Sequence, residues 1–258
     1  MVTPKGDLRV DPLARRLAES LRREQWLRPE ASVLVGVSGG GDSVALLCLV
    51  HALAPENRWR LEVFHANHGL RGDAADRAET LVREMAESLG LTLSVRALDI
   101  ERKTRHRSFE EVARAARLEA LCEVCRERGI DAVALAHTRD DLAETVLHRA
   151  LRGTGLAGLA AMRPATEVEG IRLIRPLLGE TREGLRLFLR DHQIPWDEDE
   201  TNTSPVSTRN RIRHTVLPLL RREINPRADE ALARLAEHAA QDDAQLEADV
   251  DAQLTKMN

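Results

Sequence analysis

Residues 33–43 read Val33-Leu-Val-Gly-Val-Ser-Gly-Gly-Gly-Asp-Ser43, and this segment sets the architecture of the chain. A β-branched, apolar run of strand length stops at Ser38, and apolar residues at helical spacing begin at Val44. The pattern predicts a strand, a glycine turn and the first turn of a helix. Glycines let a ligand approach the main chain, and the helix dipole places roughly half a positive charge at the turn. The segment therefore predicts a phosphate-binding site.

The pattern Ser-Gly-Gly-x-Asp-Ser narrows the phosphate chemistry. A Walker-type loop needs a Lys after its last Gly, and the dinucleotide fingerprint needs Gly-x-Gly-x-x-Gly, so neither motif fits. Asp42 would repel a bare phosphate unless a divalent cation lay between them, and we therefore expect a Mg²⁺-nucleotide, with Asp42 as the metal ligand. The residues expected around the nucleotide are Ser38, Gly39, Gly40, Gly41, Asp42 and Ser43.

The composition describes a globular protein rather than a disordered one. The 258 residues are 43% apolar and 31% charged, with a formal net charge of -4. This length allows one large α/β domain with a small appendage. The N-terminus lacks a hydrophobic signal segment and no run approaches membrane-spanning length. We therefore expect a soluble, cytoplasmic protein with no membrane partner.

Strand and helix patterns alternate along the first two thirds of the chain. This alternation predicts an α/β fold, in which a parallel sheet carries helices on both faces. The predicted strands cover residues 33–37, 61–65, 91–95, 132–136 and 171–178, and the main predicted helices cover 11–26, 74–89, 109–128, 141–151 and 181–192. Residues 153–158 read as a glycine-rich turn, and Pro218 is expected to kink or break a helix.

We divide the chain into a catalytic domain at residues 1–222 and a helical tail at residues 223–258. The predicted helix over 228–256 is polar and carries only a thin apolar stripe. Such a stripe suits a tail that packs on a further domain or on a partner chain, which leaves a homodimer open.

Two carboxylates lie at the start of the predicted helix that follows the strand at 132–136. Asp141 and Glu144 are three residues apart and share a helix face, where they could bind Mg²⁺ or a substrate ammonium group. The plainer interpretation is that Thr138 and Asp141 form a capping box. His137 precedes them at the sheet edge where open α/β sheets bind ligands. The position next to a phosphate loop on the same sheet favours function.

Arginines concentrate in two places that could face a substrate. Arg114 and Arg117 are three apart within the helix at 109–128, so at least one should face the cleft. Residues 209–222 hold five further arginines in fourteen positions, at Arg209, Arg211, Arg213, Arg221 and Arg222. Charge runs are usually solvated surface, but around one cleft these would bind an RNA backbone.

The loop at 38–43 resembles that of the PP-loop ATP pyrophosphatases, which hold ATP there during its cleavage to AMP and pyrophosphate. Over residues 33 to 220 the resemblance narrows to the tRNA(Ile)-lysidine synthetases, because further blocks follow in that family's order. These blocks are His65-Ala-Asn-His-Gly-Leu-Arg71, Glu110-Glu-Val-Ala-Arg114, Ala136-His-Thr-Arg-Asp-Asp-Leu-Ala-Glu-Thr145, Leu151-Arg-Gly-Thr-Gly-Leu156 and Arg209-Asn-Arg-Ile-Arg213. The first of them separates this family from its thiolating and amidating relatives.

The resemblance implies a ligase that uses ATP and Mg²⁺. The oxygen at the 2-position of the wobble cytidine, in a tRNA(Ile) with a CAU anticodon, would attack the α-phosphate, and L-lysine would then displace AMP to form lysidine. In this scheme Asp42 handles Mg²⁺ and pyrophosphate, Asp141 and Glu144 hold the lysine ammonium, and Arg114 and Arg209 hold the anticodon nucleotide. The remaining implied contacts are Asn67, His68 and His137 toward the nucleotide, and Arg71, Arg117 and Arg213 toward the substrate.

Two alternatives stay open. The pair Cys122 and Cys125 could mark a tRNA-thiolating relative, but it lacks a second pair, and core packing on a helix explains it better. The other alternative is a non-catalytic RNA-binding module.

Overall fold

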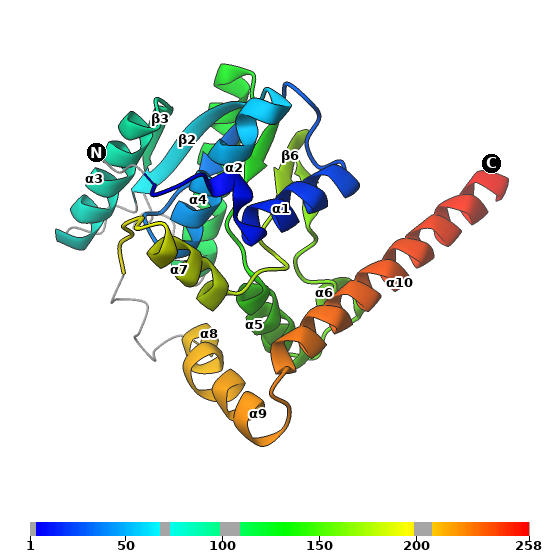
Figure 1. The fold of residues 1–258 in the computed structure, drawn as a ribbon. Coiled ribbons are helices and arrows are strands. Elements are labelled where there is room, and N and C mark those ends of the chain that lie inside the picture. The colour runs from blue at the N-terminus through cyan, green and yellow to red at the C-terminus, as the bar shows by residue number, and fades with distance from the viewer. Residues whose placement is uncertain (1–3, 68–72, 99–108, 199–207, 258) are drawn as a thin grey trace. The chain divides into compact units, whose positions relative to one another are not determined.

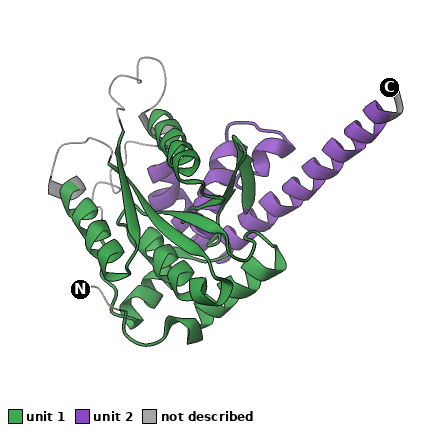
Figure 2. Cartoon of the chain, turned by 90° about the horizontal axis from the view of Figure 1, so that it is seen from above, with its two compact units in different colours: residues 1–136, 165–199 green, residues 137–164, 200–258 purple. Residues whose placement is uncertain are grey.

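The computed structural model describes residues 4–67, 73–98, 109–198 and 208–257. The chain divides into two compact units, which Figure 2 shows in green and purple. Unit 1 comprises residues 1–136 and 165–199, and unit 2 comprises residues 137–164 and 200–258. The predicted domain boundary after residue 222 stays a prediction.

Unit 1 is built on a six-stranded sheet with the strand order β3-β2-β1-β4-β6-β5. Four strand pairs are parallel, and only β5 pairs antiparallel, at the edge next to β6. The strands are β1 Ser32–Gly36, β2 Arg60–Asn67, β3 Thr92–Ala97, β4 Ala132–Ala134, β5 Ala165–Val168 and β6 Ile171–Ile174. The predicted parallel α/β sheet is confirmed, with one antiparallel strand added.

Helices cover both faces of this sheet, as predicted (Figure 1). Alternate residues of β1 belong to different cores: Val33 and Val35 pack with α1, α2, α3 and α7, whereas Leu34 packs with α4. This alternation is the period of two that places successive strand side chains on opposite faces. The helices of unit 1 are α1 Pro12–Arg23, α2 Gly41–Asn57, α3 Asp73–Ser88, α4 Phe109–Arg128 and α7 Arg182–Asp191, after a 3-10 turn at Leu8–Val10.

The edge strand β5 was not predicted, because Ala165-Thr-Glu-Val168 is short and half polar. It forms a hairpin with β6 through a two-residue loop, since Val168 pairs with Ile171. Both loop residues have positive φ, 52° at Glu169 and 77° at Gly170. Such a turn matches the twist of a hairpin but ordinarily carries Asn-Gly or Asp-Gly. The Glu-Gly pair at 169–170 is a weaker sequence signal for such a hairpin turn.

Unit 2 is helical and has a small core of its own. Ala143, Ile212 and Leu217 are buried together, and Leu147, Leu220 and Leu232 pack against them. Its elements are α5 Arg139–Ala150, α6 Leu156–Leu159, α8 Thr208–Arg211, a π-helical turn at Ile212–Val216, α9 Leu217–Glu223 and α10 Ala228–Met257. The backbone stays helical from α8 through the π-helical turn into α9, and Pro218 comes directly after that turn, where the Leu217 N–H bonds to the Ile212 carbonyl. The predicted irregularity at Pro218 is therefore a π-helical turn within a continuing helix. The predicted turn at 153–158 contains the start of α6.

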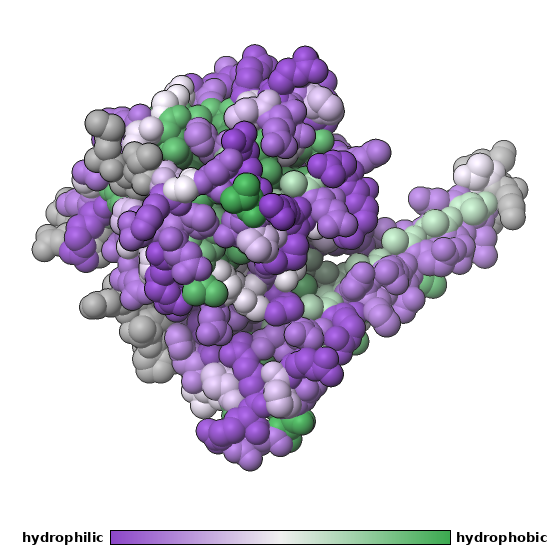
Figure 3. All heavy atoms as spheres, viewed as in Figure 1, coloured by the Kyte–Doolittle hydropathy of each residue, from purple (hydrophilic) through white to green (hydrophobic). Residues whose placement is uncertain are grey.

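The second half of α10 carries an exposed apolar stripe. Leu246, Val250 and Leu254 recur every four residues and are each 54% exposed. In the view of Figure 3 the helix presents weakly apolar residues, in pale green, beside polar ones in purple. No helix in the described part of the chain is both long and apolar enough to cross a membrane.

The cysteines are packing residues of unit 1. Cys48, Cys122 and Cys125 are all buried, which confirms the interpretation of Cys122-x-x-Cys125 as core packing. Burial raises the pKa of Cys125 to about 12, so its thiolate is scarce near neutral pH. Within the described residues no group of three His, Cys, Asp or Glu side chains could hold a metal ion.

His192 ties the N-terminal segment of unit 1 to α7. Its Nδ1 lies 2.8 Å from the carbonyl oxygen of Lys5, and its Nε2 lies 3.0 Å from a carboxylate oxygen of Asp11. Both partners accept hydrogen bonds, so only the doubly protonated imidazolium can donate to both. Burial opposes the charge, but the bonds to Lys5 and Asp11 outweigh it and raise the pKa of His192.

We therefore predict that His192 stabilises the fold more at acidic pH. A folded pKa above the unfolded value means that the contribution is complete below the unfolded pKa and is lost as pH rises through the folded pKa. The difference in unfolding free energy between the parent and His192→Gln should be up to about 1 kcal/mol at pH 5.5 and should shrink by pH 8.5. Urea titrations at both pH values measure it. A difference independent of pH would contradict the prediction.

Candidate functional site

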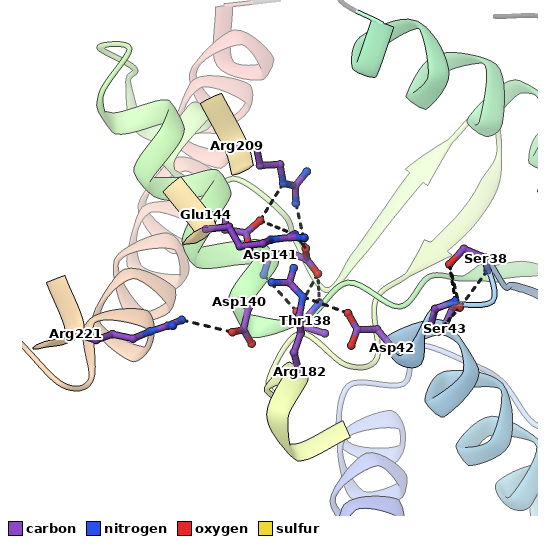
Figure 4. A network of polar contacts seen from close by, with 12 residues as sticks. Ser38, Asp42, Ser43, Thr138, Asp140, Asp141, Glu144, Arg182, Arg209 and Arg221 are labelled. Carbon is purple, nitrogen blue, oxygen red and sulfur yellow. Dashed lines mark hydrogen bonds and ion pairs between the residues drawn. The ribbon is translucent and has the colours of Figure 1, made fainter. Parts of the chain in front are cut away.

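The predicted phosphate loop closes on itself through two serines, which Figure 4 shows at the start of α2. The Ser38 main-chain N–H donates to Ser43 Oγ at 3.1 Å, and Ser43 Oγ donates to the Gly40 carbonyl at 2.8 Å. The two hydroxyls are 3.2 Å apart. Since the Ser43 proton goes to Gly40, the Ser38 hydroxyl donates to Ser43. Ser43 thus fixes the shape of the loop.

Glycine is required at Gly39 for two separate reasons. Its φ of +96° lies where side chains are rarely tolerated, and an added Cβ would meet the Cβ of Ala78 on α3 at 3.2 Å. At Gly41 an added Cβ would stand 3.4 Å from Trp196 and 3.5 Å from Leu189. The loop is therefore packed from α3 on one side and from α7 and the residues after it on another.

Trp196 and Asp197 are loop neighbours that sequence reasoning missed. The main-chain N–H of Asp197 donates to the Gly39 carbonyl at 3.0 Å, and the Trp196 ring packs near Gly41. Their segment follows α7, far from the loop in sequence. The dipeptide Pro195-Trp196 after a helix was a local signal for a fixed turn, but nothing in it indicated its partner.

The loop fits a nucleotide phosphate. Gly40 is the N-cap of α2 and supplies no side-chain cap, and its own N–H makes only a long bond of 3.4 Å to the Ser38 hydroxyl, which a phosphate oxygen could replace. Asp42 lies in the first turn and could give Mg²⁺ one carboxylate ligand, with phosphates and water completing the shell. A pocket of about 420 Å³ nearby, between α3 and Trp196, has Asp76, Glu84 and Asp197 against one arginine in its lining. Its excess of acids makes that pocket a poor site for phosphate.

Asp42 already has a cationic neighbour in unit 1. Arg182, the first residue of α7, donates from Nε to Asp42 Oδ2 at 3.3 Å (Figure 4). The two side chains are 17% and 26% exposed. Arg182 was not among the predicted site residues.

Asn67 ends β2 and is held by α3. Its side-chain amide donates to Glu79 at 2.9 Å, and this bond, with a second from Arg83, lowers the pKa of Glu79. His65, two residues earlier, is buried and donates from Nδ1 to the Val37 carbonyl at 2.8 Å. The predicted nucleotide residue His68 and the predicted substrate residue Arg71 lie outside the described residues.

Arg114 and Arg117 both lie on α4 with exposed side chains. A third arginine of unit 1, Arg175, follows β6 and is only 7% exposed. Burial, and then the positive charge of Arg114, lower the pKa of Arg175 to about 10. Positive charge thus gathers around Arg114, and Arg175 adds to it without having been predicted.

In unit 2, Asp141 performs the plainer role that the sequence allowed. Thr138 and Asp141 form a capping box at the start of α5, in which the Thr138 N–H and hydroxyl both donate to Asp141 Oδ2 at 2.9 Å. The other carboxylate oxygen, Oδ1, accepts from Arg209 at 3.2 Å and from Arg213 at 3.4 Å. One oxygen therefore caps the helix, and the other faces the arginines.

Glu144 is the most buried charge of the cluster, with a side chain 1% exposed. Arg213 grips it with two bonds, at 2.7 Å from Nε and 2.9 Å from Nη2, and Arg209 adds a third at 3.0 Å (Figure 4). Paired guanidinium and carboxylate groups of this geometry form strong, charge-assisted bonds. The structure thus unites four predicted residues, Asp141, Glu144, Arg209 and Arg213, in one cluster, the carboxylate cluster.

The carboxylate cluster is a site for positive charge. Two carboxylates on one helix face hold two cationic side chains, and an ammonium group could take a place among them. His137, half-buried, stands just before the cap residue Thr138. The roles predicted for these residues, and their meeting with the phosphate loop at one sheet edge, stay predictions.

Comparisons with known proteins identify the family of the chain. The family model of the PP-loop domain matches residues 11–220. A tRNA(Ile)-lysidine synthase from Solibacter usitatus is 44% identical over 86% of this chain and 48% of the relative. Another from Chlorobaculum tepidum is 36% identical over 88% of this chain and 68% of the relative. The chain spans about half the length of several of these curated relatives.

A solved structure shares the fold at low identity. It is a U34-tRNA thiolase from Methanococcus maripaludis with a [4Fe-4S] cluster, with a TM-score of 0.75 and 18% identity over 89% of this chain and 78% of that one. This likeness concerns the fold alone. The family model covers residues 11–220, and the chain is 36% identical to a relative of which it covers 68%. The chain therefore belongs to the PP-loop domain proteins, among the tRNA(Ile)-lysidine synthases.

Proposed function

We propose that this protein is an ATP-dependent, tRNA-modifying ligase that joins L-lysine to the wobble cytidine of a tRNA(Ile) with a CAU anticodon. The observation that carries the proposal is the carboxylate cluster, in which Asp141 and Glu144 hold two cationic side chains. A site built for positive charge suits lysine, and the phosphate loop suits ATP. Membership of the tRNA(Ile)-lysidine synthases names the reaction that uses both.

The first step of this reaction uses the phosphate loop. The cytidine oxygen forms a bond to the α-phosphorus, the bond from that phosphorus to the bridging oxygen breaks, and pyrophosphate leaves with the electron pair. The glycine main chain and the start of α2 would hold the phosphates, and Mg²⁺, bound through Asp42, would offset their charge. No covalent intermediate with the protein is needed, so positioning and electrostatics supply the catalysis.

The second step uses lysine. Its ε-amine, after giving a proton to water, forms a bond to carbon 2 of the base. The bond from that carbon to the adenylate oxygen breaks, and AMP leaves with the electron pair. Asp141 and Glu144 would hold the ammonium form before attack, in the place that Arg209 and Arg213 now share. Arg114 and Arg117, with His137 and Asn67, remain proposed contacts to the anticodon nucleotide and to ATP.

The direct test is incubation with ATP, Mg²⁺, labelled lysine and a CAU-anticodon tRNA(Ile) transcript. We expect label in the RNA, with AMP and pyrophosphate formed in equal amounts. A transcript whose wobble base is uridine is the control and should take up no label. Absence of both label and pyrophosphate would overturn the proposal and favour a non-catalytic RNA-binding module. Label-free AMP formation would point to another nucleophile.

Thiolation finds no support in the cysteines. Cys122 and Cys125 are buried and their pKa values are raised by burial. Replacing both with Ala should leave lysine incorporation unchanged.

The Arg209→Ala variant tests whether the carboxylate cluster also contacts the RNA backbone. If Arg209 contacts a phosphate, Arg209→Ala should weaken tRNA binding and lower the slope of log affinity against log salt by about one. Arg23→Ala is the control, because Arg23 is an exposed arginine at the end of α1, outside the arginine-rich segment, and its loss should leave the slope unchanged. Filter binding at four salt concentrations measures the slopes. Equal slopes for parent and Arg209→Ala would make Arg209 a partner of the carboxylates only.

A homodimer would bury the exposed stripe of α10. Leu246, Val250 and Leu254 offer the apolar contact, but five acids and one lysine between residues 242 and 256 would repel an identical helix. Sedimentation at low and high salt tests this, because screening should favour the dimer.

A further inference from the structure

Arg182 occupies a place that disfavours a cation. It is the first residue of α7, directly after the N-cap Thr181, whose hydroxyl accepts from the Gly184 N–H at 3.1 Å. The helix dipole is positive at this end, so an arginine there is repelled by the helix that carries it. An anion close to the side chain would offset this cost. Asp42, at 3.3 Å, is one such anion.

The position of Arg182 is fixed by the core rather than by its own contacts. Leu185 and Leu189 are fully buried and Phe188 is 3% exposed, and α7 packs against α2. The N-terminus of α7 is therefore held beside the first turn of α2, where the phosphate loop ends. The Arg182 side chain is 17% exposed, so it stays accessible to a ligand.

The guanidinium group of Arg182 can serve more than one acceptor. A guanidinium carries five N–H donors, and the bond to Asp42 uses Nε at a long 3.3 Å. The same group can hold a carboxylate and a phosphate oxygen together. Asp42 alone would repel the triphosphate of ATP, and Arg182 supplies the balancing charge within this chain.

We propose that Arg182 binds the β- and γ-phosphates of ATP and stabilises the pyrophosphate as it leaves. This rests on the proposed function, in which the bond between the α-phosphorus and the bridging oxygen breaks. The electron pair then moves onto the pyrophosphate, next to Asp42. A guanidinium aimed at this developing charge strengthens its hydrogen bonds in the transition state.

Pyrophosphate binding to the protein alone tests this residue. Calorimetric titration with Mg²⁺-pyrophosphate and, separately, with AMP needs neither tRNA nor lysine. In Arg182→Ala we expect pyrophosphate affinity to fall about 10- to 100-fold and AMP affinity to change less than about twofold. Arg182→Lys should lie between, because it keeps the charge and loses the planar fork. Arg186→Ala, one turn along α7 with an exposed side chain, should match the parent.

Two outcomes would overturn the proposal. If the pyrophosphate affinity of Arg182→Ala stays within twofold of the parent's, Arg182 does not contact pyrophosphate. Equal loss of AMP and pyrophosphate affinity would make Arg182 a support of the loop as a whole. If Arg182→Ala does not fold, Arg182→Gln and Arg182→Lys are compared instead. Failure of the parent to incorporate lysine would contradict the proposed function. The pyrophosphate and AMP titrations need no lysine, so they test the role of Arg182 independently of that result.

Discussion

Glu144→Gln is expected to reduce kcat/KM for lysine by about 100-fold or more while ATP affinity changes less than about twofold. The amide keeps the volume of the side chain but removes the charge on which three guanidinium bonds depend and which, in the proposed function, holds the lysine ammonium. Breaking a buried ion pair costs about 3–5 kcal/mol, and the 24–30% exposure of the two arginines reduces this to roughly 1–3 kcal/mol of stability. Lysine titrations at saturating ATP and tRNA measure the first effect, and urea unfolding the second.

Asp140→Asn is the control for this variant. Asp140 neighbours the cluster in sequence and forms an ion pair with Arg221 at 3.5 Å. Asp140→Asn removes a carboxylate charge next to the cluster and should leave the lysine dependence intact. A Glu144→Gln enzyme with the parent's lysine dependence would mean that the cluster only supports the fold of unit 2.

Gly39→Ala is expected to lower AMP formation by at least about 100-fold and to cost about 1–3 kcal/mol of stability. The methyl group would meet Ala78 at 3.2 Å, and φ of +96° would be strained, so the loop must move away from its phosphate-binding shape. AMP release in the presence of tRNA and lysine measures the activity.

Gly90→Ala separates backbone strain from loss of the site. Gly90 also has positive φ, +67°, but an added Cβ there meets nothing within 4 Å. It should lose stability and keep activity. If Gly39→Ala retained the parent's AMP formation, the glycine turn would not be the phosphate site.

Local patterns were sufficient for most of the elements. The continuous apolar run at Val33 to Val35 and the helical period after Val44 are properties of neighbouring residues, and both elements formed where predicted. The strand predicted over 171–178 ended at Ile174, because the chain turns through Arg175 and Pro176 toward α7. β5 escaped prediction because its hairpin turn lacks the usual residues and its pairing depends on β6.

The carboxylates show how one pattern can hold two roles. Asp141 was expected either as a cap or as a site residue, and its two oxygens do different things, one in the capping box and one toward Arg209. The sequence spacing of three residues predicted that Asp141 and Glu144 share one face of a helix. Their pairing with arginines 65 to 72 residues away depends on the packing of α8 and the π-helical turn against α5.

The segment at 33–43 thus determined from its own residues a strand, a glycine turn and a helix start, because main-chain freedom and side-chain periodicity are local. What surrounds that turn was decided by tertiary structure. Arg182 reaches Asp42 across 140 residues, and Asp197 reaches Gly39, since the burial of Leu185 and Leu189 fixes α7 beside α2. The free energy of apolar burial is a sum over the whole core. A short stretch of sequence therefore cannot predict which polar groups the packing of the core will bring to the loop.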